Sequence, residues 1–137
     1  MNNATPKLKD LAHRLIAHEA SANKPGGKKT PEAFQVCEKL RGPLSRLAGV
    51  GGFRSLLART LVLASAEVSW LRTLQVEADG SLEGLEKIQA EFDPQKIAEG
   101  EVVLVSQLLG LLVTFIGPAL TQHLLRDIWP KLDDLNV

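Results

Sequence analysis

The most reactive side chains of this sequence belong to three histidines and a single cysteine. His13 and His18 are five positions apart, about 140° around a regular helix, so one helix cannot direct both at the same metal ion. His123 is distant from both in the sequence, and neither HExxH nor paired-cysteine zinc spacing occurs. Cys37 falls on an apolar helical stripe, where a thiol ordinarily serves as a small core residue. With no Ser-His-Asp set, nucleophile elbow or phosphate-binding loop, we predict no catalytic residue, no metal site and no cofactor.

A pair of glycines followed by an arginine is the one local arrangement suited to binding an anion. Gly51 and Gly52 precede a predicted helix whose second residue is Arg54. Free amides at a helix start, together with a guanidinium group, can hold a phosphate or a carboxylate. Paired glycines between helices more often serve only the turn. Gly51, Gly52 and Arg54 are therefore a candidate anion site, with the simple turn as the alternative.

Among the acidic residues, Glu67 has the most distinctive position. It follows Ala64 by three residues and precedes Leu71 by four, near the apolar face of a predicted long helix. This spacing predicts a partly buried carboxylate with a partner such as an arginine. A solvated carboxylate at the rim of the core is the ordinary alternative.

The charge of the chain is balanced overall but unevenly distributed. Its 137 residues contain 16 basic and 16 acidic side chains, and residues 1–60 hold 11 of the bases but only four of the acids. This split permits attraction between the two parts, within one chain or between copies. Nucleic-acid binding is not expected, because a neutral chain with 4% aromatic residues lacks the usual basic and aromatic surface.

The start of the sequence and its cysteine content favour a cytoplasmic protein. The first ten residues, MNNATPKLKD, lack the apolar run of a secretory signal. A single cysteine cannot form an internal disulfide and fits a reducing compartment. Two stretches, GFRSLLARTLVLASAE and FIGPALTQHLLRDIWP, are typical of bacterial helical proteins but indicate no activity.

The spacing of apolar residues predicts that helices position these side chains. An apolar stripe gives an amphipathic helix over 6–20, and the sequence SANKPGGKKT makes 21–30 an exposed flexible loop. Thr30-Pro31 then signals the start of a second helix, with threonine as the cap and proline in the first turn. Its stripe continues through Gly42-Pro43, where the proline should kink or divide the helix.

Glycines at 49–52 end this second helix and supply the positive φ angles that a tight reversal needs. A longer helix is expected over 53–75. Asp79-Gly80 marks a turn, after which Ser81 is expected to cap a short amphipathic helix that reaches Phe92. Nothing in the pattern predicts a β-strand or a hairpin.

The last helical region follows a second cap-and-proline signal at Asp93-Pro94. It covers 95–129, with an expected kink at Gly117-Pro118 and a stop at Trp129-Pro130. The whole pattern predicts one all-α domain over 1–137, a compact bundle of five or six helices around a hydrophobic central helix.

Between residues 102 and 122 the sequence has no charged side chain for 21 residues. As a helix this segment would be about 30 Å long, enough for a membrane span or for the buried centre of a helical domain. The amphipathic helices elsewhere in the chain need a shared apolar surface to pack against, which favours a buried helix here. A core helix that can also insert into a membrane is a further possibility. The question depends on whether four small or polar residues face inward or outward: Gln107, Gly110, Thr114 and Gly117.

These observations favour a non-enzymatic protein that acts through contacts with a protein partner or as a homo-oligomer. One alternative is a membrane-inserting or pore-forming effector that uses 102–122, including Leu112 and Phe115. Another is a carrier of apolar small molecules or lipids, with a cavity beside Leu108, Leu112 and Phe115. An enzyme site assembled from distant residues would leave no sequence motif.

Overall fold

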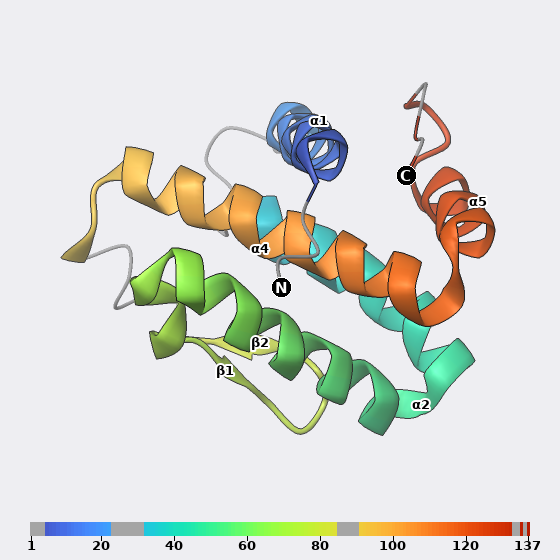
Figure 1. The fold of residues 1–137 in the computed structure, drawn as a ribbon, viewed down its shortest axis with the longest axis horizontal. Coiled ribbons are helices and arrows are strands. Elements are labelled where there is room, and N and C mark those ends of the chain that lie inside the picture. The colour runs from blue at the N-terminus through green and yellow to red at the C-terminus, as the bar shows by residue number, and fades with distance from the viewer. Residues whose placement is uncertain (1–4, 23–31, 85–90, 133–134, 136) are drawn as a thin grey trace.

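Helices make up most of the chain that the computed structural model describes, namely residues 5–22, 32–84, 91–132, 135 and 137. The elements are, in chain order, α1 (Pro6–Ala22), α2 (Glu32–Glu67), the 3-10 helix η1 (Ser69–Thr73), β1 (Gln75–Val76), β2 (Leu82–Glu83), α4 (Pro94–Ile116) and α5 (Pro118–Ile128) (Figure 1). The all-helical character is confirmed, but the described chain has four α-helices where the sequence predicts five or six, and it also has a short hairpin.

Helix α1 begins where its sequence predicts. The Thr5 hydroxyl accepts a hydrogen bond from the Leu8 amide at 3.2 Å, and Pro6 occupies the first turn, where its missing N–H costs nothing. Its apolar stripe is buried against the rest of the molecule. The helix continues to Ala22, so the predicted start of the loop at residue 21 is two residues too early. The other residues of the predicted loop, 23–30, lie outside the described chain.

Helix α2 has a sharp bend at Gly49 rather than a break at Gly42-Pro43. Gly49 has φ 79° and ψ 162°, while helical geometry continues through Pro43. Pro43 removes one backbone hydrogen bond, but Leu40 and Leu44 on either side of it are buried, and their packing holds the helix together there. The positive φ predicted for the glycine run therefore belongs to Gly49, and the two arms of α2 run in different directions from it (Figure 1).

The segment after α2 differs most from the sequence prediction. The helix ends at Glu67, well before the expected residue 75, and η1 and an antiparallel hairpin follow, with Gln75 opposite Glu83. The predicted turn at Asp79-Gly80 is present, with Gly80 at φ 88°. The prediction of a helix from Ser81 is wrong at Leu82–Glu83, which form strand β2. Residues 85–90 of the predicted helix lie outside the described chain.

The reason is the local hydrogen bonding of the turn. The Asp79 carboxylate accepts bonds from both the amide and the hydroxyl of Ser81, at 2.9 and 2.6 Å. These bonds hold the pKa of Asp79 below its usual value. Ser81 therefore bonds to the Asp79 carboxylate within the turn and does not cap a helix. Gly84 also has a non-helical backbone, with a positive φ of 105°.

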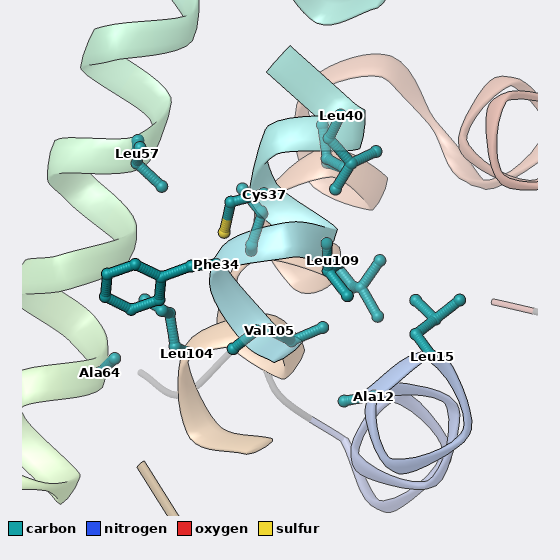
Figure 2. Close-up of a cluster of buried hydrophobic side chains, with 14 of the residues drawn as sticks. Ala12, Leu15, Phe34, Cys37, Leu40, Leu57, Ala64, Leu104, Val105 and Leu109 are labelled. Atoms are coloured by element: carbon teal, nitrogen blue, oxygen red, sulfur yellow. The ribbon is translucent and has the colours of Figure 1, made fainter. Parts of the chain in front are cut away.

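Helices α4 and α5 match their predicted signals. The Asp93 carboxylate accepts a bond from the Lys96 amide at 2.9 Å, and Gly117, at φ 86°, ends α4 where the kink is expected. Helix α4 packs against α1, α2 and α5. Figure 2 places Leu104, Val105 and Leu109 of α4 in one buried apolar cluster with side chains of α1 and α2.

Two helices, α2 and α4, are long and apolar enough to cross a membrane by length and composition alone. Most of the apolar stretch in α4 is buried inside the protein, whereas less than a third of that in α2 is. Core helices of soluble proteins pass the same test.

Candidate functional site

A pocket of about 510 Å³ lies between α1, the carboxyl end of α2 and the first half of α4. Its walls combine apolar side chains from α1, α4 and the residue that follows α2 with one lysine, one histidine and three carboxylates. The lining residues are Lys9, His13, Ile16, Glu67, Val68, Gln95, Ala98, Glu99, Glu101, Val102 and Val103. A pocket of this size, mostly apolar with a few charged groups, is typical of small-molecule sites.

Glu67 joins the three helices at one side of this pocket. Its carboxylate lies 3.8 Å from the Lys9 ammonium of α1 and accepts a hydrogen bond from the Gln107 amide of α4 at 3.1 Å. Glu67 is nevertheless exposed, so it fits the alternative of a carboxylate at the rim of the core better than that of a partly buried acid, and its partners are a lysine and an amide rather than an arginine. The Lys9–Glu67 pair also links the basic first part of the chain to the acidic remainder, as does the pair between Arg41 and Asp79 at 3.4 Å.

Glu101 is the more unusual carboxylate of the pocket. It is buried, and it accepts a hydrogen bond from the Ala33 amide in the first turn of α2 at 3.3 Å. Burial in an apolar environment raises the pKa of Glu101 to about 7, and the negative charge of Glu32 adds to this effect, while hydrogen bonds from the backbone amides of Ala33 and Glu32 oppose it. Within the described residues, no lysine, arginine or histidine lies within ion-pair distance of Glu101.

Sequence reasoning missed Glu101, although a signal was present. It precedes Leu104 and Val105 by three and four residues, so a helix that begins at Asp93-Pro94 places it on their apolar face. What the sequence could not provide is the other wall, since Ala33 and Ile16 come from segments far away in the chain.

A second buried carboxylate that the sequence did not indicate, Glu19, lies outside the pocket. It accepts hydrogen bonds from the Lys39 ammonium at 2.6 Å and from the Trp129 indole at 2.9 Å. The same ammonium lies 5.9 Å from the centre of the Trp129 ring. Glu19 therefore connects α1, α2 and the residue that follows α5, and its partners compensate for its burial.

The candidate anion site at the bend of α2 has only part of its expected geometry. Gly51 and Gly52 follow the bend at Gly49 but already belong to the first turn of the second arm, whereas the sequence predicts that they precede the helix. Gly51 and Arg54 are exposed and Gly52 is half-buried. The site remains a prediction.

The residues of the uncharged segment divide into two groups. Gln107, Gly110 and Leu112 are buried, and Leu108 is buried beside them. Thr114 and Phe115, one turn later, are exposed, and Gly117 is half-buried. The segment is therefore core in its first part and surface near its end.

Several large apolar side chains are exposed where α2 bends and where α4 turns into α5. We call this group the apolar end: Leu47, Val50, Phe115 and Leu120. In Figure 1, both bends lie at the same end of the long axis of the molecule, on the right. Large exposed apolar patches mark contact sites in many proteins.

The remaining candidate groups do not form a reactive site. Burial, with a smaller effect of Glu38, raises the pKa of the Cys37 thiol to about 12, so it is not a nucleophile. His13 borders the pocket, His18 is half-buried, and His123 lies 3.6 Å from Asp127 on an exposed face.

Across the described parts of the chain, no three His, Cys, Asp or Glu side chains are arranged to hold a metal ion. The 510 Å³ pocket lies beside residues 95–103 of α4, not beside Leu108 and Leu112 as the carrier hypothesis expects. Comparison of the sequence and the fold with family models, curated proteins and solved structures finds no match.

Proposed function

We propose that this protein is a non-enzymatic, cytoplasmic assembly module that binds a second copy of itself through the apolar end. The observation that carries the proposal is the exposure of four large apolar side chains there: Leu47 at 52%, Val50 at 48%, Phe115 at 64% and Leu120 at 41%. In this proposal α4 is the central helix of the bundle, which is supported by its contacts with α1, α2 and α5.

The energetics favour weak association. Complete burial of such side chains stabilises by about 1.5–3 kcal/mol each, and roughly half of their surface is already out of water. Four side chains from each of the two copies therefore leave about 6–12 kcal/mol for the contact. Association costs at least about 4 kcal/mol in lost freedom of motion. Opposite charges on the two parts of the chain can add attraction between copies. We therefore expect a dissociation constant on the order of tens of micromolar.

Sedimentation velocity at protein concentrations from about 5 to 500 µM tests this proposal. The wild type should shift from monomer to dimer across the range, and Phe115→Ser should shift the midpoint upward about tenfold, which corresponds to 1.4 kcal/mol. Val62→Ser is the matched control, because Val62 is 69% exposed but lies on the second arm of α2, away from the bend. A protein that stays monomeric at 500 µM, or equal effects of the two variants, would contradict the proposal.

Membrane insertion is the second candidate, supported by the two helices that are long and apolar enough to span. It predicts that the protein releases dye from vesicles of mixed neutral and anionic lipids and that Phe115→Asp weakens this leakage. Leu112→Asp tests the same idea less cleanly, because Leu112 is buried and a charge there would unfold the protein. Intact vesicles at a protein concentration that gives dimers would exclude insertion and leave assembly.

A further inference from the structure

The pocket between α1, α2 and α4 combines an apolar wall with an excess of carboxylates. Ile16, Val68, Val102 and Val103 are each half-buried and packed against the core, and together they leave a hydrocarbon surface open to the pocket. A volume of about 510 Å³ lies within the range of pockets that hold small organic molecules.

The charges of the pocket do not cancel. The Lys9 ammonium is already 3.8 Å from the Glu67 carboxylate, so this pair is close to neutral. Glu99 and Glu101 remain without a basic counterpart in the lining, where His13 is the other group that can carry a positive charge. An anionic ligand would be repelled by these carboxylates, and a neutral one would leave Glu101 buried without a cation.

From this combination we propose that the pocket binds a small amphipathic organic cation, with an ammonium group at Glu101 and a hydrocarbon part against Ile16, Val68, Val102 and Val103. The ammonium would supply a charge partner that Glu101 does not have among the described residues, and the hydrocarbon would cover the apolar wall. This ligand site is independent of the proposed assembly, because its residues do not overlap with the apolar end.

Protonation should control this binding. Ionised Glu101 attracts the ammonium, so affinity should fall as the pH drops through the raised pKa of Glu101, about 7. The other titratable groups around it are Lys9 and His13 on α1, Glu32 and Glu67 on α2, and Glu99 on α4. Glu101→Gln removes the carboxylate and keeps these other groups, so it isolates the contribution of Glu101.

The test uses three probes with the same hydrocarbon: 4-phenylbutylamine, 4-phenylbutanol and 4-phenylbutyrate. Chemical-shift titration of the protein, labelled with ¹⁵N, gives each dissociation constant at pH 8 and pH 5.5. At pH 8 the amine should bind at least tenfold more tightly than the alcohol, with the largest shifts at residues lining the pocket. At pH 5.5 this preference should fall at least fivefold.

Variants identify the residue that is responsible. Glu101→Gln keeps an oxygen for the Ala33 amide and should abolish the preference for the amine at pH 8. Glu83→Gln, an exposed carboxylate on the hairpin, is the control and should leave the preference unchanged. If Glu101→Gln does not fold, Gln95→Lys at the exposed rim places a resident ammonium in the pocket and should weaken amine binding while sparing the alcohol. Equal binding of all three probes, no binding at all, or an amine preference that survives in Glu101→Gln would overturn the proposal.

Discussion

At the scale of single residues, the two buried carboxylates of this protein differ in what surrounds them. Glu19 has a lysine and an indole N–H as partners, and both lie within 3 Å of its carboxylate. Glu101 has the backbone amides of Ala33 and Glu32 as partners, no basic side chain among the described residues, and the acidic side chain of Glu32 nearby. A buried charge is tolerated when it is paired, and otherwise the group holds its proton to a higher pH. Ionisation of Glu101 therefore destabilises the folded protein relative to the unfolded chain.

This opposition predicts how the stability of the protein depends on pH. The pKa of Glu101 is raised from its ordinary 4.5 to about 7, so between these values the folded protein keeps a proton that the unfolded chain releases. The free energy of unfolding should therefore fall as the pH rises from 4.5 to 7 by as much as about 3 kcal/mol, since a tenfold change in a proton-binding constant corresponds to about 1.4 kcal/mol. Glu101→Gln cannot ionise and should be more stable than the wild type at pH 8 by about 1–3 kcal/mol.

Urea unfolding of both proteins at pH 5, 6, 7 and 8 measures this difference. Every other titrating group is shared, so the difference between the two curves isolates Glu101. A constant difference across the pH range would show that Glu101 is ionised in the folded protein throughout.

At the scale of elements, η1 and the start of α4 pack very closely against each other. Trp70 is buried, its ring nitrogen donates to the Lys96 carbonyl at 3.2 Å, and its ring lies against Phe92 with the centroids 6.0 Å apart. The ring covers Gly100 so closely that a Cβ there would lie 2.1 Å from it. The glycine is thus required by contact with the tryptophan, not by its own backbone angles.

Replacing this glycine should separate the two elements. Gly100→Ala gains about 1 kcal/mol of helix propensity but forces the indole outward, which costs packing and the bond to Lys96, a net destabilisation of about 1–3 kcal/mol. Gly51→Ala is the control: a Cβ at this helical position meets nothing within 4 Å, so it should be neutral or stabilise by up to about 1 kcal/mol. Thermal unfolding followed by tryptophan fluorescence compares them, and equal melting temperatures would contradict the predicted clash.

The elements also show which parts of the fold the sequence determines by itself. The starts of α1 and α4 and the end of α4 were predictable, because a capping side chain, a proline or a glycine acts within a few residues. The hairpin was not, because β1 and β2 are two residues long and have too few side chains for an alternating pattern. The pocket was predictable only in part. Glu67 was identified from the spacing within its own helix, whereas Glu101 is distinctive only because α1 and α2 pack over it.

At the scale of the whole molecule, α1, α2 and α4 bury their apolar faces in one continuous cluster. Cys37 lies within it on the first arm of α2, and Figure 2 shows its thiol among side chains of both arms and of α4. The thiol is buried and its pKa is raised to about 12. No small fluctuation of a single side chain can therefore present a reactive thiolate to solvent.

The single cysteine should consequently report on the opening of the entire core. Because the thiolate is the reactive form and requires separation of α2 from α4, the folded protein should react with Ellman's reagent at least a thousandfold more slowly than the chain in 6 M guanidinium chloride. For a domain with a few kcal/mol of stability or more, the rate should rise with urea in proportion to the unfolded fraction. Labelling that follows the urea unfolding curve would establish that this core opens as one unit. Complete labelling within seconds under native conditions, or a rate independent of urea, would instead mean that the first arm of α2 separates from α4 while the other helices remain packed.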